Sequence, residues 1–148
     1  MNTVVADISM LEEILAIENE SFTSPWSRTS FVDAFNSDTV NIFALLDNNS
    51  HVIGFACLLL IDFEAELLNI AVKPDSRNKG YGHALMEHVD KYCTERNVET
   101  AYLEIRQSNI SAKRLYNKFG FTEIGVRKKY YSSPVEDAIL MQKIFKYN

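Results

Sequence analysis

Cysteine is scarce in this chain, which has only two in 148 residues, Cys57 and Cys93. Cys57 lies within the apolar run FACLLL and Cys93 near the end of a predicted helix, so the two form no framework of paired thiols. This scarcity argues against a disulfide-stabilised secreted scaffold and favours a reducing compartment. The three histidines, His51, His83 and His88, lack the spacing of metal ligands, so we expect no metal.

Long hydrophobic runs are also missing. No apolar stretch approaches the ~20 residues that a membrane-spanning helix requires. The N-terminus has no basic segment followed by an apolar segment and a small-residue cleavage site. These absences predict a soluble, cytoplasmic protein without a membrane partner.

An excess of positive charge is the third absence. The formal net charge is -5, which argues against sequence-independent binding to nucleic acid, because such binding needs a basic surface that neutralises phosphates. The chain has 148 residues, of which 47% are hydrophobic, and this is enough for one core. We therefore expect a single domain over residues 1–148, as a monomer or a weak homo-oligomer.

Glycine is sparse as well, but two of the five glycines, Gly80 and Gly82, lie in the stretch from Leu67 to Val89. Its first part, LLNIAV, predicts a buried strand, the next residues favour turns, and apolar residues then recur at helical spacing from His83 to about Asn97. A strand, a glycine loop and a helix form a unit suited to a diphosphate. The reason is that the first turn of a helix has unpaired N–H groups and carries the positive end of the helix dipole.

Three phosphate-binding patterns resemble this loop to different degrees. A Walker loop has Lys and then Ser or Thr after its last glycine, but His and Ala follow Gly82, so this pattern fails. The dinucleotide pattern is matched by Gly80, by Gly82 and by an acid, Glu104, about 20 residues further on. The chain has Leu85 where this pattern requires its third glycine. The third pattern is Arg or Gln, two residues, Gly, one residue, then Gly or Ala. Arg77, Gly80 and Gly82 match it without a gap.

The remaining elements follow from hydrophobic periodicity and turn residues. We expect strands at Thr3–Ile8, Asn41–Asp47, Val52–Asp62, Glu64–Val72, Thr100–Arg106, Phe121–Val126 and Ala138–Phe145, and helices after the capping residues Ser9, Ser27 and Asn109 or Ser108. The segment KKYYSSPVE is expected to connect the last two strands. Because side chains alternate along a strand, Glu104 and Arg106 are expected on the same face.

The glycine loop resembles the coenzyme A loop of the GCN5-related N-acetyltransferase (GNAT) family. Other motifs extend the resemblance, namely FTSPWS near the front, LEIRQSNISAKRLYNKFGF from Leu103 to Phe121, and KKYYSSPVEDAILM near the end. Within the family, the chain resembles the enzymes that acetylate the N-terminal alanine of the eighteenth small-subunit ribosomal protein. The resemblance implies an α/β (α+β) three-layer GNAT fold, with a mixed, mostly antiparallel central sheet of about seven strands flanked by about four helices.

Acetyl-CoA is the cofactor that the resemblance implies. Ile70, Ala71 and Val72 match the peptide units that contact the pantetheine arm and polarise the thioester, as backbone donors near a developing oxyanion do. The diphosphate loop corresponds to Asn78, Lys79, Gly80, Tyr81, Gly82 and His83, and Asn109 matches a further cofactor contact. Contacts with the acceptor are implied for Trp26, Tyr130 and Tyr131.

Two residues match the catalytic positions of the family. Glu104 corresponds to the general base and Tyr116 to the residue that returns a proton to the coenzyme A thiolate. An α-amine has a pKa of about 7.7 to 8.0, so a carboxylate that acts directly or through a water suffices near neutral pH. No covalent intermediate is expected, because the chain has no GxSxG elbow.

Each of these residues also has an explanation that involves no ligand. Glu104 can pair with Arg106 on its own strand. Asn109 can serve only as a helix cap, and Tyr116 can pack in the core with its hydroxyl satisfied. Trp26 can anchor the corner between the first two helices.

The acceptor implied by the resemblance is the N-terminal α-amine of a protein, in the first instance a ribosomal one. The residues around the acceptor segments, such as Thr23, Arg28, Ser132 and Val135, depart from the family pattern, which leaves other peptide N-termini or a small-molecule amine as alternatives. A nucleotide-binding module without catalysis and an NAD-binding enzyme are alternatives from other classes.

Overall fold

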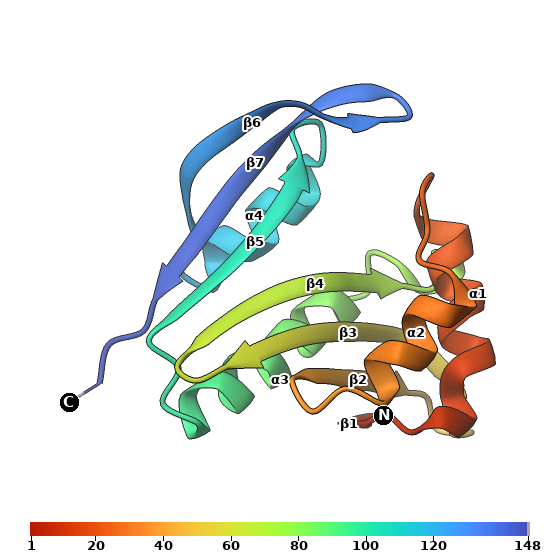
Figure 1. Ribbon diagram of the computed structural model, residues 1–148. Coiled ribbons are helices and arrows are strands. Elements are labelled where there is room, and N and C mark those ends of the chain that lie inside the picture. The colour runs from red at the N-terminus through yellow and green to blue at the C-terminus, as the bar shows by residue number, and fades with distance from the viewer. Residues whose placement is uncertain (148) are drawn as a thin grey trace.

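Seven strands and four α-helices make up the part of the chain that the computed structural model describes, residues 1–147 (Figure 1). The strands are β1 (Asn2–Val5), β2 (Val40–Leu46), β3 (Val52–Ile61), β4 (Glu64–Val72), β5 (Thr100–Arg106), β6 (Thr122–Ser132) and β7 (Val135–Ile144). The helices are α1 (Leu11–Ser21), α2 (Arg28–Phe35), α3 (Tyr81–Glu95) and α4 (Ile110–Lys118), with short 3₁₀ turns at Ile8–Met10 and Pro74–Ser76.

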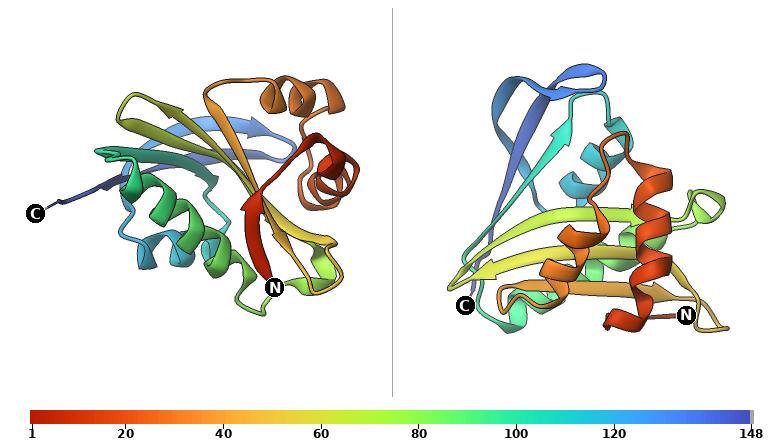
Figure 2. Two further views of the ribbon diagram at one scale, coloured as in Figure 1. Left: turned by 90° about the horizontal axis from the view of Figure 1, so that it is seen from below. Right: turned by 45° about the vertical axis from the view of Figure 1, so that its right-hand side comes forward.

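All seven strands belong to one sheet, in the order β1-β2-β3-β4-β5-β7-β6. Every neighbouring pair is antiparallel except β4 with β5, which run parallel. Helices α1 and α2 cover one face of the sheet and α3 and α4 the other (Figure 2). The predicted three-layer fold with a mixed, mostly antiparallel sheet is therefore confirmed. Within residues 1–147, no helix has the length and hydropathy to cross a membrane.

The beginning of the chain differs from the prediction in its cap. The edge strand ends at Val5, and the 3₁₀ turn before α1 is capped by Asp7 rather than by Ser9. The reason is that the Asp7 side chain accepts a hydrogen bond from the backbone N–H of Ser9 at 2.9 Å. At the next helix the prediction is confirmed, because the side chain of Ser27 accepts from the N–H of Ser30 at 3.1 Å.

The end of the chain differs more. The segment KKYYSSPVE was expected to connect two strands, but most of it is strand, because Tyr131 and Ser132 of β6 pair with Glu136 and Val135 of β7. The register of this hairpin shifts between Arg127 and Tyr131. An irregular register of this kind interrupts the two-residue alternation from which strands are predicted.

A β-bulge in β4 decides which side chains meet each core. Cys57 of β3 pairs with Asn69, whereas the next residue of β3 pairs with Leu67, so Leu68 has no partner of its own. Before the bulge, Leu67 packs in the core under α3, and after it Ala71 packs in the core under α1 and α2. Both positions have odd numbers, so strict alternation would place them on one face. The bulge separates them.

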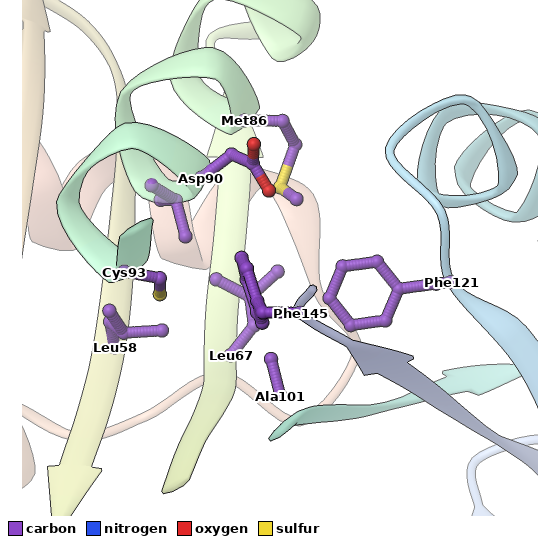
Figure 3. A pocket seen from close by; sticks show the side chains of 9 residues that line it. Leu58, Leu67, Met86, Asp90, Cys93, Ala101, Phe121 and Phe145 are labelled. Carbon is purple, nitrogen blue, oxygen red and sulfur yellow. The ribbon is translucent and has the colours of Figure 1, made fainter. Parts of the chain in front are cut away.

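A small cavity remains between α3 and the sheet (Figure 3). Its volume is about 10 Å³, which is room for no more than about one water molecule. The side chains of Leu67, Phe121 and Phe145 line it, together with the carboxylate of Asp90 and the thiol of Cys93. Burial raises the pKa of Cys93 to about 12, so this thiol is protonated and unreactive at neutral pH.

Candidate active site

The sheet splits between its two parallel strands. β4 and β5 pair only at their first residues, from Glu64 with Thr100 to Glu66 with Tyr102, and they then diverge (Figure 1). The bulge at Leu68 lies at the start of the divergence, and bulges bend a strand and increase its twist. Peptide groups of β4 that point away from β3 beyond this position have no partner on β5. They form a row of backbone donors and acceptors inside the molecule.

A cavity of about 740 Å³ occupies this split, a volume typical of small-molecule sites. Its walls come from the end of α1, the corner between α1 and α2, β4, β5, the start of α4 and the β6–β7 hairpin. Of the site residues that the sequence predicts, those that line the cavity are Trp26, Ile70, Glu104, Asn109, Tyr116, Tyr130 and Tyr131. The fold thus gathers both predicted catalytic side chains and all three predicted acceptor contacts around one space.

Glu104 lies on β5 at the wall of the cavity, and 23% of its side chain is exposed. Its partner is Arg127 of β6, with 3.3 Å between Nε of the arginine and Oε1 of the carboxylate. The alternative in which Glu104 pairs with Arg106 is wrong, because Arg106 pairs with Glu136 at 3.2 Å. No residue within 1–147 donates a hydrogen bond to Oε2 of Glu104, so this oxygen is free to accept a proton.

Tyr116 lies on α4, and only 4% of its surface is exposed. Its ring packs edge-on against Phe121, with 6.0 Å between the ring centres. Burial raises the pKa of Tyr116 above the usual range of a phenol, so the hydroxyl is protonated at neutral pH. The hydroxyl has no hydrogen-bond partner among the described residues. The alternative of a core tyrosine is correct in its packing but wrong in its satisfied hydroxyl, which is a donor available to a ligand.

Asn109 is the N-cap of α4. Its Oδ1 accepts a hydrogen bond from the N–H of Ala112 at 3.2 Å, so the capping explanation is correct. Because the cap uses only this oxygen, the two hydrogens on Nδ2 are left for other partners in the cavity that Asn109 lines.

The glycine loop lies at the start of α3, and neither this loop nor Ala71 and Val72 contribute to the lining of the large cavity. The helix begins at Tyr81, two residues before the predicted His83, and Gly80 is its N-cap with a φ of +84°. Asn78 also has a positive φ, +62°. Left-handed residues ahead of a helix turn successive N–H groups toward one point, which is how anion-binding loops are built. The loop, Asn78–His83, therefore has a backbone conformation of the kind found in anion-binding loops.

Other contacts of this loop hold it in place. Arg77, the first residue of the matched loop pattern, donates to the carbonyl oxygen of Val72 and to Oγ of Ser21, each at 3.0 Å. It therefore ties the loop to β4 and α1. His83 contacts Oε1 of Glu87 at 2.9 Å through Nδ1.

Glu18 is a candidate that the sequence did not identify. It lies on α1 with 1% of its surface exposed and accepts a hydrogen bond from the backbone N–H of Trp26 at 2.8 Å. Nδ2 of Asn69 lies 3.0 and 3.1 Å from its two carboxylate oxygens. The pair joins α1, the Trp26 corner and the β4 bulge, and it lines the cavity. One signal was present, since Glu18 stands four residues after the buried Ile14, on the apolar stripe of the helix.

The two tyrosines expected on an acceptor loop lie on β6. Tyr130 is exposed, and its ring meets that of Tyr131 edge-on, with 5.2 Å between the ring centres. The guanidinium of Arg127 lies 5.5 Å from the Tyr130 ring and that of Arg106 lies 4.4 Å from the Tyr131 ring. Cation–π contacts at these distances orient the rings at the rim of the cavity.

Comparison with known proteins places this geometry in context. Residues 11–121 match the model of the acetyltransferase (GNAT) family. The chain is 36% identical over 144 residues to the ribosomal protein bS18-alanine N-acetyltransferase of Escherichia coli strain K12. This alignment covers 95% of this chain and 96% of that protein. It is 37% identical over 134 residues to the Haemophilus influenzae enzyme of the same name, which covers 88% of this chain and 89% of that protein.

A solved structure agrees with these matches. The crystal structure of the ribosomal-protein-S18-alanine N-acetyltransferase from Escherichia coli superposes with a TM-score of 0.92 at 33% identity. The superposition covers 99% of this chain and 95% of that chain, so the split sheet and its flanking helices correspond over nearly their whole length.

Replacing Glu18 by Gln should change how stability depends on pH. Burial raises the pKa of Glu18 above its ordinary value of 4.5, so the folded wild-type protein holds this proton more tightly than the unfolded chain does. Wild-type stability therefore falls as the pH rises from about 4.5 through the raised pKa, and Gln removes this loss. We expect the unfolding free energy of E18Q, measured with urea at successive pH values, to increase relative to that of wild type as the pH rises through this window.

Glu20→Gln is the matched control, because Glu20 lies on the exposed face of the same helix. It should change the unfolding free energy by less than about 0.5 kcal/mol. Parallel pH profiles for E18Q and wild type would contradict the assignment.

Replacing Gly80 by Ala should weaken the binding of coenzyme A. The left-handed φ of +84° makes Ala less favourable than Gly at this position by about 1 kcal/mol of folding free energy. The added Cβ has no neighbour within 4 Å in the protein, so a loss of affinity for coenzyme A would arise from contact with the ligand. Isothermal titration with coenzyme A should show a Kd raised severalfold. Gly125→Ala is the control, since that position has open space and no positive φ. Unchanged affinity in G80A would argue against the diphosphate loop.

Proposed function

The chain belongs to the acetyltransferase (GNAT) family, and from this we propose that it transfers the acetyl group of acetyl-CoA to the N-terminal α-amine of a protein. The acceptor we propose is the N-terminal alanine of ribosomal protein bS18, the reaction for which the relatives from Escherichia coli and Haemophilus influenzae are named. An acceptor of this kind is made in the cytoplasm, where we propose that the protein acts.

One observation carries the proposal. The cavity in the split sheet has Glu104 and Tyr116 on its walls, the free edge of β4 on one side and the Trp26 corner facing Tyr130 and Tyr131 at its rim. These are a proton acceptor, a proton donor, a row of backbone groups and two apolar walls around a space large enough for a thioester arm and a peptide end. Nothing in this arrangement requires a covalent intermediate between the acetyl group and the enzyme. The amine can therefore attack the thioester directly.

The donor fits the residues that would hold it. Acetyl-CoA supplies a thioester, whose carbonyl carbon is attacked and whose sulfur leaves as a thiolate. The N–H groups of Asn78–His83 would bind the diphosphate, because this loop precedes the positive end of the α3 dipole. The N–H groups in Ile70–Val72 that point away from β3 would orient the thioester arm and donate to its carbonyl oxygen.

Glu104 acts as the general base in this proposal. The α-amine has a pKa of about 7.7 to 8.0, so near neutral pH most of it carries the proton that must leave. Oε2 of Glu104 accepts this proton directly or through a water, while Arg127 holds the other oxygen of the carboxylate at 3.3 Å. A single ion pair with a half-exposed arginine fixes the direction of the carboxylate.

Tyr116 acts as the proton donor. Its raised pKa ensures that Oη carries a proton whenever the leaving sulfur arrives. A thiol has a pKa of about 8.5, well below that of this phenol, so Tyr116 donates effectively only from within hydrogen-bond distance. Its position on the buried face of α4 supplies a fixed direction for that bond.

Acetylation of an alanine-initiated peptide tests the proposal, and Glu104→Gln tests the base. With acetyl-CoA and a peptide of the bS18 N-terminus, mass spectrometry should detect one added acetyl group on the α-amine. E104Q should lower kcat/KM by roughly 10²- to 10⁴-fold near pH 7, because the amine loses its proton acceptor, and the deficit should shrink as the pH passes the amine pKa.

Coenzyme A should bind E104Q as it binds wild type, and Glu64→Gln, at the exposed start of β4, should leave turnover unchanged. Acetylation of a free polyamine with no acetylation of peptides would reject the proposed acceptor. Full activity in E104Q would reject the base.

Replacing Tyr116 by Phe should slow turnover and leave the fold intact. The phenyl ring keeps its packing against Phe121, while the donor to the leaving sulfur is lost, so we expect kcat to fall by roughly tenfold or more. Release of coenzyme A is the measurement. Tyr102→Phe is the control, because Tyr102 does not line the cavity. A Y116F enzyme with wild-type kcat would remove Tyr116 from the mechanism.

A further inference from the structure

Arg106 stands at the end of β5, two residues after Glu104, and has no part in the proposed chemistry. It lines the cavity with 24% of its side chain exposed. Its charge is neutralised by Glu136, at 3.2 Å between Nη1 and Oε1, and not by the carboxylate of Glu104. The proposed reaction therefore gives no reason for a guanidinium in this half-buried wall, beside the general base.

The contacts of Arg106 lie on two sides. On one side, Nη1 donates to the carbonyl oxygen of Pro134 at 3.0 Å and Nη2 to that of Ser133 at 3.2 Å, and the guanidinium lies 4.4 Å from the Tyr131 ring. These contacts fix the β6–β7 turn. On the other side, Nη2 donates to Oγ1 of Thr23 at 3.3 Å. The planar guanidinium has N–H donors in fixed directions, so it can bind the hairpin carbonyls and Thr23 at the same time. A lysine ammonium cannot do this.

Thr23 belongs to the opposite wall of the cavity. It lies in the corner between α1 and α2, three residues before Trp26, whereas Tyr131 and the β6–β7 turn belong to the other arm of the split sheet. Within residues 1–147, the bond from Arg106 to Thr23 is the only hydrogen bond that joins residues 11–36 to residues 100–144. It therefore crosses the mouth of the cavity, where β4 and β5 provide no pairing.

We propose that Arg106 is a positioning residue, which sets the separation of the two acceptor walls through its hydrogen bond to Thr23. The inference rests on the proposed function in that it takes this mouth as the entrance for the acceptor. When the bond is present, the Trp26 corner and the Tyr131 side of the hairpin stand at a fixed distance, so an incoming peptide end meets a preformed slot. When it is absent, the walls must be ordered at the moment of binding, which weakens acceptor binding and leaves the donor site untouched.

Thr23→Val and Thr23→Ser separate this bond from the rest of the network. Valine keeps the β-branched shape of threonine and removes only the hydroxyl, so the contacts of Arg106 with the hairpin persist. We expect T23V to raise KM for the alanine-initiated peptide by roughly twofold to tenfold, the range that one hydrogen bond supplies. KM for acetyl-CoA, kcat and the melting temperature should stay within error of wild type. T23S keeps the hydroxyl and should restore the wild-type KM.

Arg106→Lys extends the test to the donor. It keeps the charge and loses the fork, so KM for the peptide should rise at least as much as in T23V. An unchanged KM in T23V would overturn the inference, and so would a rise in R106K alone, since Arg106 would then act only through the hairpin. If the wild-type protein acetylates a polyamine and no peptide, the proposed function fails, and KM for that polyamine in T23V decides the inference. Turnover of neither amine would overturn both.

Discussion

The separation of β4 from β5 is the constraint on which the rest of the molecule depends. Two parallel strands that paired along their whole length would satisfy each other's backbone groups and leave no interior space. Here the pairing stops at Glu66, beside the bulge at Leu68, and a cavity of about 740 Å³ opens between the strands. The backbone polar groups that lose their partners are the ones that we propose bind the acetyl donor, so one local irregularity supplies both the space and groups able to form hydrogen bonds in it.

The cost of such an opening is met by side chains that hold its walls. Glu18 and Asn69 join α1 to the bulge under the cavity, and Arg106 joins the hairpin to the α1–α2 corner over its mouth. Burying a carboxylate is unfavourable unless hydrogen bonds compensate, and the three bonds to Glu18 offset part of that cost, since its pKa stays raised. The catalytic candidates have simpler surroundings. Glu104 has one exposed ionic partner, and the hydroxyl of Tyr116 has none among the described residues.

Local sequence predicted the parts of the site that depend on neighbours in the chain. The glycine loop, the Asn109 cap and the strand that carries Glu104 follow from turn propensity, capping and alternation, and each is found within two residues of its predicted place. Contacts with other elements were not predicted. Glu104 pairs with Arg127 of β6 rather than with Arg106 of its own strand, and the strands that carry Tyr130 extend through the segment expected to connect them, because both depend on how β6 and β7 align with their neighbours.

By itself, the sequence determined the acetyltransferase family and the order of the elements, and it supplied the side chains that we propose to react. These are properties of residue type and short-range spacing, which persist wherever the segments lie. Only the tertiary structure decided that Asn69 faces Glu18, that Arg127 rather than Arg106 holds Glu104, and that Arg106 reaches Thr23. The reason is that a bulge reverses which face of a strand a residue occupies, and that a side chain's partners are set by sheet order and register, neither of which leaves a periodic trace in one chain.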